Sequence, residues 1–275
     1  DEFKKNASDR FVNCGIAEGN MMSMAAGLAM SGLRPIVYTI TPFTTTRCLE
    51  QIKVSVAYHE APVIIIGTGS GLSYSELGPT HHSFEDLAII RSIPGMQVLS
   101  PSDRNELILQ LREALDSKKP TYIRIGKKGE PDLFDNSKNL GIGKANILSE
   151  GNEILILAIG PIVSEALKAV KILKEKNISV AVATMGGVKP IDNQFLETMA
   201  RRGFKKWVTL EEHSIIGGLG STILEWISST NIYNKVDVHR LGIKDSFIHE
   251  LGNQSFTRKK LGLDYEGIAY FVENL

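Results

Sequence analysis

One regularity limits the fold of this chain more than any other: short apolar runs rich in β-branched residues alternate with longer segments of helical periodicity. Runs that are apolar throughout predict strands buried on both faces, as in parallel sheets covered by helices. The predicted strands are 35–40, 62–67, 96–99, 121–125, 153–159, 179–185 and 207–210. The predicted helices are 17–31, 44–60, 103–117, 164–176, 193–202 and 217–229. We therefore expect an α/β protein made of three-layer α/β/α sandwiches with mostly parallel sheets.

The alternation is interrupted once, between Gly126 and Gly151. This stretch is rich in Gly, Lys, Asp and Asn and has little hydrophobic periodicity, as is typical of a connection. We therefore expect two domains, residues 1–126 and 151–275, joined by a linker at 127–150. The chain begins with Asp1 rather than Met and enters a motif almost at once, so we expect that its natural N-terminus is truncated.

Composition excludes several functional classes. The 31 Lys and Arg residues balance 31 Asp and Glu residues, which argues against a partner that is nucleic acid or a membrane surface. The longest apolar stretch, 21–33, is too short and too interrupted to span a bilayer. Two cysteines, Cys14 and Cys48, make neither a disulfide framework nor a metal site by themselves, which favours a reducing cytoplasm.

Glu18 is the first residue with a candidate chemical role. It stands at the start of a predicted helix that otherwise consists mostly of Ala, Met, Gly, Leu and Ser. One interpretation is an acidic residue that complements the helix dipole. The other is a desolvated acid that exchanges a proton with a ligand nitrogen.

His81 and His82 form the second candidate, directly after a Gly-Pro turn and before a predicted helix. Adjacent side chains point in different directions, so we expect only one of the two to face a given ligand. No nearby Cys or second His at helical spacing supports a zinc site. A solvated or structural histidine pair is the alternative.

Four motifs occur in order: GIAE at 15–18 before a helix of small residues, Pro-Phe at 42–43, GPTH at 78–81, and RSIPGMQVLSPSD at 91–103. A fifth stretch, LEEHSIIGGLGS at 210–221, contains a glycine-rich turn. Together they resemble the transketolase superfamily of thiamine diphosphate enzymes over nearly the whole chain. The resemblance implies a pyrimidine-binding domain followed by a transketolase C-terminal domain.

The resemblance also implies roles for individual residues. Glu18 matches the glutamate that hydrogen-bonds a ring nitrogen of the cofactor's aminopyrimidine and so activates the cofactor. Phe43 matches the aromatic residue that packs on the pyrimidine ring, with a plain core phenylalanine as the alternative. His81 matches the histidine that contacts substrate near the reacting carbon, and His82 is then expected to support it. His213 is not expected to be catalytic.

Two arginines are candidate substrate contacts. Arg47 lies in TRCLEQI at 46–52, which is similar to a pattern in deoxyxylulose-phosphate synthases and 2-oxo acid dehydrogenase β subunits. Arg124 matches an arginine at the end of the last strand of this domain in transketolases, where it binds a sugar phosphate; a guanidinium fork suits that task. A surface arginine and a strand-end charge are the respective alternatives, and Arg91 is expected to be structural.

The departures from the family pattern are also informative. Leu77 stands where transketolases carry an acid before GPTH, and Gly69 stands where they carry a histidine, which predicts an altered donor or acceptor pocket. No GDG motif, which the family uses to hold Mg²⁺ and the cofactor's diphosphate, occurs in the chain. The resemblance therefore implies the C-terminal half of a split transketolase. Its partner would be an N-terminal subunit that carries GDG and holds most of the Mg²⁺ site, in an α2β2 assembly acting on sugar phosphates.

Other interpretations remain open. Within the superfamily, the chain could be a 2-oxo acid dehydrogenase β subunit or a deoxyxylulose-phosphate synthase-like enzyme that uses pyruvate. A fragment of a longer transketolase would have the same sequence features. From a different class, it could be a non-catalytic scaffold subunit that keeps only the fold. A nicotinamide-binding domain is disfavoured, because the predicted strand 153–159 runs into AIGPIVSEA without GxGxxG.

Overall fold

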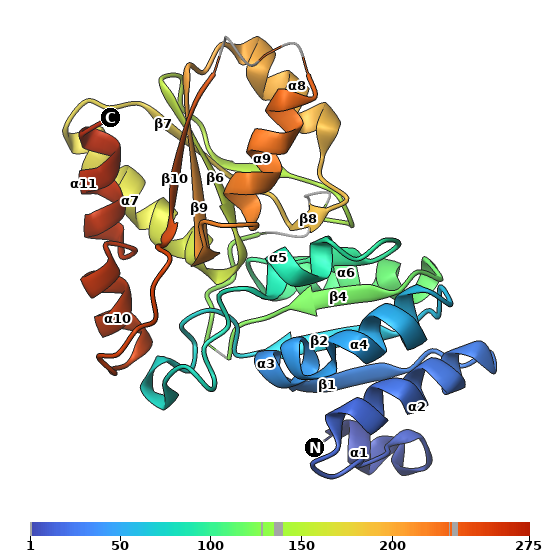
Figure 1. The fold of residues 1–275 in the computed structure, drawn as a ribbon. Coiled ribbons are helices and arrows are strands. Elements are labelled where there is room, and N and C mark those ends of the chain that lie inside the picture. The colour runs from blue at the N-terminus through green and yellow to red at the C-terminus, as the bar shows by residue number, and fades with distance from the viewer. Residues whose placement is uncertain (1, 128, 135–139, 231, 233–235) are drawn as a thin grey trace.

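A computed structural model describes residues 2–127, 129–134, 140–230, 232 and 236–275 (Figure 1). The chain folds into two α/β domains that lie one above the other in this view, with the N-terminus in the lower domain and the C-terminus in the upper one. Each domain contains one five-stranded sheet. The α/β class with mostly parallel sheets is thus confirmed.

The first sheet has the strand order β1-β2-β4-β3-β8. β1 (Ile36–Ile40), β2 (Ile64–Thr68), β3 (Gln97–Leu99) and β4 (Thr121–Arg124) are parallel, whereas β8 (Gly187–Lys189) adds an antiparallel edge. β8 lies beyond residue 150, so the part of the chain predicted as the second domain contributes a strand to the first sheet. Sequence patterns do not show this strand because its three residues, GVK, form no apolar run.

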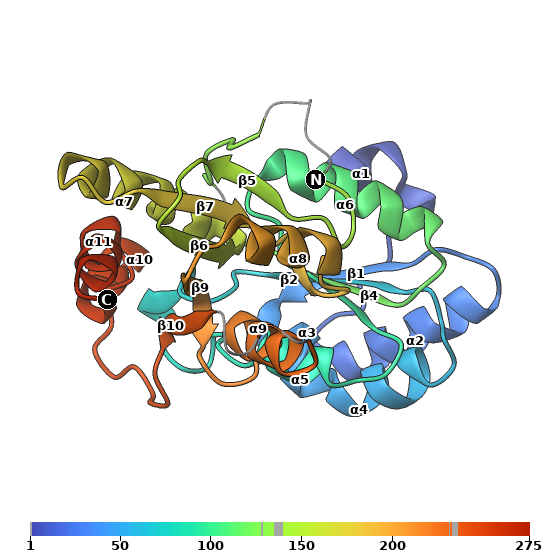
Figure 2. The ribbon, with the colours of Figure 1, turned by 90° about the horizontal axis from the view of Figure 1, so that it is seen from above.

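Helices cover both faces of the first sheet. α2 (Glu18–Met30), α4 (Leu49–Gln51) and α5 (Asp86–Arg91) lie on one face and α6 (Arg104–Asp116) on the other (Figure 2). The remaining elements are α1 (Glu2–Asn6), α3 (Thr41–Thr44), the π-helical turn η3 (Ile52–Ala57), and the 3-10 turns η1 (Ser8–Arg10), η2 (Thr46–Cys48) and η4 (Ser75–Leu77). The helix predicted at 44–60 is therefore broken into four short pieces.

The second sheet repeats this plan with the order β10-β9-β6-β7-β5. β6 (Ile154–Ile159), β7 (Val180–Thr184), β9 (Lys206–Ser214) and β10 (Asp237–Ile243) are parallel, and β5 (Asn146–Ser149) is antiparallel. β5 lies within the segment predicted as the linker 127–150, of which residues 128 and 135–139 are outside the described chain.

Two pairs of helices sandwich the second sheet. α7 (Val163–Glu175), which follows η5 (Gly160–Ile162), packs with α11 (Tyr265–Glu273) on one face, and α8 (Asn193–Arg202) and α9 (Leu219–Ser228) cover the other. α10 (Gln254–Leu261) precedes α11. Every residue of β6 is buried, and its alternating side chains enter two different core clusters. This explains why its sequence is apolar throughout. Within the described residues, no helix is long and apolar enough to cross a membrane.

Candidate functional site

The candidate site lies at the carboxyl edge of the first sheet. Ile40 at the end of β1 pairs with Thr68 at the end of β2, and Gly67 pairs with Arg124 at the end of β4. The loops that follow these three strands therefore start side by side. Ligands of open parallel sheets bind at this edge.

Glu18 begins α2, and the helix runs back from this edge toward the start of β1. No side chain caps the N-terminus of this helix. Glu18 is the acidic residue of its first turn, where a negative charge is favourable to the helix dipole. Its side chain is only 13% exposed and accepts a hydrogen bond from Arg47 Nη1 at 3.0 Å. The predicted site acid is thus held in place and still reaches solvent.

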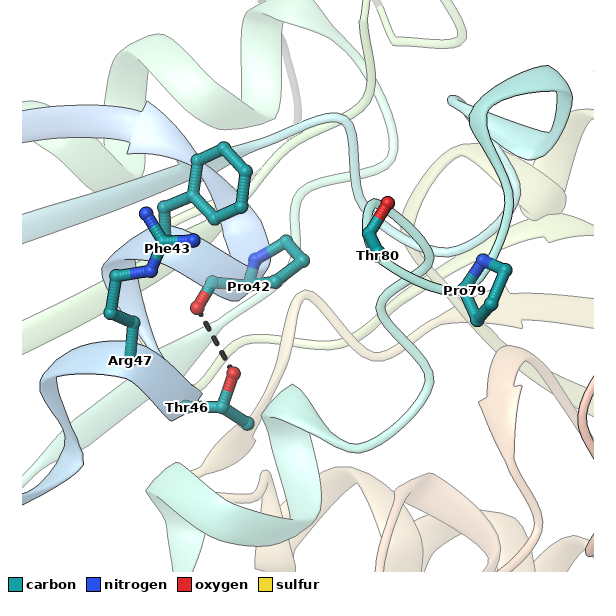
Figure 3. Close-up of a pocket in the computed structure, with 6 residues that line it drawn as sticks. All are labelled: Pro42, Phe43, Thr46, Arg47, Pro79 and Thr80. Atoms are coloured by element: carbon teal, nitrogen blue, oxygen red, sulfur yellow. Dashed lines mark hydrogen bonds between the residues drawn. The ribbon is translucent and has the colours of Figure 1, made fainter. Parts of the chain in front are cut away.

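Phe43 and Arg47 follow β1 on α3 and η2. The Arg47 guanidinium carbon lies 4.1 Å from the centroid of the Phe43 ring, so the cation packs on the ring face. Figure 3 shows the two side chains on one wall of a pocket of about 560 Å³, with Pro79 and Thr80 on the opposite side. Thr46 donates a hydrogen bond to the Pro42 carbonyl and fixes the turn between them.

His81, from the loop after β2, lies beside Phe43, which lines this pocket. Its ring lies edge-on to Phe43, with centroids 5.5 Å apart, and edge-on to Tyr74, with centroids 6.3 Å apart. Its Nδ1 shares a hydrogen bond of 2.9 Å with Thr80 Oγ1. His82, in contrast, is buried and donates from Nε2 to the Ser75 carbonyl, so the two histidines of the pair have different surroundings and His81 is the one beside Phe43.

Lys127 extends this set of neighbouring side chains. Its ammonium lies 4.7 Å from the centroid of the Tyr74 ring and pairs with Glu76 at 3.3 Å. Lys127 was not predicted as a site residue, because Arg124 matches the family motif and Lys127 does not. Its position just after β4, the last parallel strand of this sheet, is the sequence feature that could have identified it. We call the following six residues the site row: Glu18, Phe43, Arg47, Tyr74, His81 and Lys127.

Arg124, the predicted phosphate contact, lies elsewhere. Its side chain is 1% exposed, and Nε donates to Asp86 Oδ2 at 2.8 Å. Nη2 donates to the carbonyls of Ser83 and Glu212. With the guanidinium buried and engaged in this way, the structure favours a structural role for Arg124 over the predicted substrate contact.

Arg124 belongs to a buried polar junction between the two domains. We call it the domain seam, and its members are Asp86, Tyr122, Arg124, Glu211, Glu212 and His213. Burial raises the pKa of the Asp86 carboxyl, but the Arg124 cation, His213 and the hydrogen bonds from Tyr122 and Ser83 together outweigh it, and the pKa lies below its usual value. The Tyr122 hydroxyl donates to the same carboxylate at 2.7 Å.

The second domain supplies the other half of the seam. Glu212 accepts from Leu72 N at 2.6 Å and from Arg258 Nε at 2.6 Å. Burial lowers the pKa of His213 to about 4, so its imidazole is neutral at physiological pH; Nδ1 donates to the Ser214 carbonyl. Its Nε2 accepts a hydrogen bond of 3.5 Å from Ala88 N, so His213 links the second domain to the first. That it is not catalytic stays a prediction.

The described residues contain no cluster of His, Cys, Asp and Glu that could hold a metal ion. The site row has one carboxylate near the pocket and three cationic or imidazole groups, a set that suits an anionic or nitrogen-containing organic ligand.

Comparison with known proteins identifies the family of both domains. Residues 1–130 match the pyrimidine binding domain of transketolase, and residues 143–268 match the transketolase C-terminal domain. The chain is similar to a subunit of the apulose-4-phosphate transketolase of Phocaeicola vulgatus, with 37% identity over 98% of this chain and 84% of the relative. It is also similar to a 1-deoxy-D-xylulose-5-phosphate synthase of Syntrophus aciditrophicus, with 37% identity over 99% of this chain but 42% of the synthase.

A solved structure described as a split gene transketolase, inactive beta4 tetramer, matches with a TM-score of 0.88 and 34% identity, covering 99% of this chain and 86% of that one. These matches extend over both domains and include the candidate site. The chain belongs to the thiamine diphosphate-dependent transketolase family and carries the family's pyrimidine-binding and C-terminal domains.

Proposed function

We propose that this chain is the C-terminal subunit of a split transketolase, which transfers a two-carbon ketol unit from a ketose phosphate to an aldose acceptor. The observation that carries the proposal is the run of contacts at the carboxyl edge of the first sheet: Arg47 pairs with Glu18 and packs on Phe43, and the Phe43 ring meets His81. Phe43 and Arg47 also line the pocket. A subunit kept only as a scaffold would not need this acid, ring and imidazole together.

The residues present fit one end of thiamine diphosphate. The Phe43 ring offers an aromatic surface against which an aminopyrimidine can stack, and the Glu18 carboxylate can hydrogen-bond a ring nitrogen. When bound, the cofactor supplies the nucleophilic carbon that takes up the ketol unit. Arg47 would hold Glu18 in position through their ion pair until the ligand arrives.

Substrate binding falls to the other half of the site row. His81 would hydrogen-bond the substrate oxygen next to the reacting carbon through Nε2, because Thr80 engages Nδ1 and the ring lies beside Phe43. For the substrate phosphate we propose Lys127 in place of Arg124, since the Lys127 side chain is 43% exposed while that of Arg124 is buried. Arg47 remains a candidate second contact.

The other end of the cofactor needs a second polypeptide. The described residues offer no ligand set for Mg²⁺ and the chain has no GDG motif, so we propose an N-terminal subunit that binds the diphosphate and Mg²⁺ and completes the site in an α2β2 assembly. Two relatives support this proposal by their names, one a subunit of a transketolase and the other a split gene transketolase whose beta4 tetramer is inactive. Two free cysteines support a cytoplasmic enzyme.

Calorimetry tests the proposal directly. Thiamine diphosphate and Mg²⁺ would be titrated into this chain alone, and into its mixture with a candidate N-terminal subunit that carries a GDG motif. We expect binding only in the mixture, followed by ketol transfer from a ketose phosphate to an aldose. Tight binding by the single chain would contradict the split site. An assembled mixture that binds neither cofactor nor substrate would point to the scaffold alternative.

A pyruvate-using enzyme is the second candidate, because a deoxyxylulose-phosphate synthase is 37% identical over nearly the whole chain. The same reconstituted complex discriminates the two. Consumption of pyruvate with release of carbon dioxide, and no reaction with ketose phosphates, would replace the transketolase assignment with a synthase-like one.

A further inference from the structure

Tyr74 occupies an unusual place at the candidate site. Gly69, directly after β2, has a φ of +73°, and a Cβ built there would overlap the Tyr74 ring. The ring therefore lies where a side chain at position 69 would begin. Because both the backbone conformation and the space exclude a side chain, Gly69 and Tyr74 form a matched pair in which glycine makes room for the ring.

The ring also lies next to both groups that we propose to bind substrate, His81 and Lys127. His81 approaches it edge-on with centroids 6.3 Å apart, and the Lys127 ammonium lies 4.7 Å from its centroid. Glu76 holds Lys127 from another direction at 3.3 Å. The imidazole at the reacting end and the cation at the phosphate end thus share one aromatic neighbour.

We propose that Tyr74 determines which acceptors the enzyme prefers, by favouring short-chain aldehydes that carry a terminal anionic group over longer sugars. This rests on the proposed transketolase function. An acceptor whose aldehyde lies at His81 and whose phosphate lies at Lys127 has to pass the Tyr74 ring. The ring fills space that the carbon chain of a longer sugar would need, and it fixes Lys127 through the cation–ring contact.

A substitution of Tyr74 should change the preference for acceptor length without changing cofactor activation. Tyr74 contacts neither Glu18 nor the Phe43 ring among the recorded interactions of the described residues, so cofactor activation does not depend on it. Replacing it by a small residue opens the path between His81 and Lys127. The expected change is therefore in the ratio of kcat/KM between acceptors, carried mainly by KM.

The experiment uses the reconstituted complex with a constant ketose donor and two acceptors, glyceraldehyde 3-phosphate and ribose 5-phosphate. For the unaltered protein we expect a preference for the three-carbon acceptor. Tyr74→Ala should shift the ratio of kcat/KM toward the five-carbon acceptor by at least about tenfold. Tyr74→Phe keeps the ring and should keep the ratio. Dissociation constants of both acceptors, measured calorimetrically without donor, should follow the same order.

The matched control is Tyr270→Ala, which removes an exposed tyrosine on α11 in the second domain and should leave both acceptors unaffected. If Tyr74→Ala does not fold, as judged by circular dichroism, Tyr74→Leu gives the same comparison. An unchanged ratio in an active variant overturns the proposal, and so does an equal loss with both acceptors. A complex that transfers ketol units to no aldehyde would instead refute the proposed function, so the two failures are distinguishable.

Discussion

The site row and the domain seam contain the same kinds of side chain in opposite circumstances. In the site row, Arg47 is 47% exposed and its recorded polar partner is one carboxylate, Glu18. In the seam, Arg124 is 1% exposed and donates to Asp86 and to two backbone carbonyls. Both residues are arginines, so residue type does not distinguish a side chain that is accessible to a ligand from one with a structural role. Exposure and the number of hydrogen bonds within the protein distinguish them.

The two regions should respond differently to substitution. Exposed ion pairs contribute about 0–1 kcal/mol to stability, whereas removing one partner of a buried pair costs about 3–5 kcal/mol. Changes in the site row should therefore alter activity and leave the fold intact. Changes in the seam should lower the free energy of unfolding first and activity only as a consequence.

The largest expected effect is that of Glu18→Gln. The variant keeps the shape of the side chain but removes the charge and the proton-accepting oxygen, so turnover of the reconstituted complex should fall by about 10²–10⁴-fold. Thermal unfolding of the chain should change little. Steady-state rates and circular dichroism measure both. Glu197→Gln on α8 is the control, since Glu197 is an exposed partner of Arg201. Unchanged turnover would remove Glu18 from the catalytic site.

Asp86→Asn should have the next largest effect, on stability. It leaves the Arg124 cation buried without its counterion, which should lower the free energy of unfolding by about 3–5 kcal/mol. Urea denaturation of the full chain measures this. Glu225→Gln provides the contrast because it weakens a pair with Arg91 in which Glu225 is 63% exposed, and should cost less than about 1 kcal/mol. Equal effects of the two substitutions would contradict the distinction between seam and surface.

Much of the fold could be predicted because its signal is local. β2 and β6 are buried on both faces and carry continuous apolar sequences. The antiparallel edge strands β5 and β8 could not be predicted in the same way. Each has only three or four residues, and its partner comes from another part of the chain. Their pairing is a tertiary effect without a periodicity of its own.

The part of the candidate site that lies in recognisable motifs could be predicted from the sequence. Glu18, Phe43, Arg47 and His81 follow motif positions, and the structure brings them into contact one after another. The burial of Arg124 could not be predicted, because its ion-pair partner, Asp86, lies at the start of α5 in a different segment of the chain. Nothing in the sequence near position 124 shows that the guanidinium is engaged. Whether these residues perform their predicted roles stays a prediction.

A substitution of Lys127 tests whether this residue, rather than Arg124, contacts the substrate phosphate. Lys127→Met removes the exposed cation and should raise KM for a phosphorylated acceptor about tenfold or more, since a hydrogen bond to a charged group contributes about 1.5–3 kcal/mol. KM for glycolaldehyde, which has no phosphate, should not change. Lys174→Met on the exposed side of α7 is the control. The same increase for both acceptors would argue against a phosphate contact.

The smallest expected effect is a pH dependence that originates in the seam. Burial raises the pKa of Glu211 to about 7, although Leu219 N and Gly220 N donate to its carboxylate. The folded state thus holds this proton more tightly than the unfolded chain. The resulting stabilisation is fully present below the ordinary carboxyl pKa and is lost as pH rises through about 7.

Between pH 6 and 8 this group should account for roughly 1 kcal/mol of lost stability, because one unit of pKa corresponds to about 1.4 kcal/mol. His213, whose pKa burial lowers, contributes more stability as pH rises over the same range, so the net slope of the unaltered chain is not diagnostic. The difference between the unaltered chain and Glu211→Gln is diagnostic, because only the carboxyl is removed. In urea denaturation at pH 6, 7 and 8, the stability of the unaltered chain relative to the variant should fall as pH rises. A constant difference would mean that Glu211 is already ionised in the seam, and that its charge, like that of Asp86, is balanced by the neighbouring arginines.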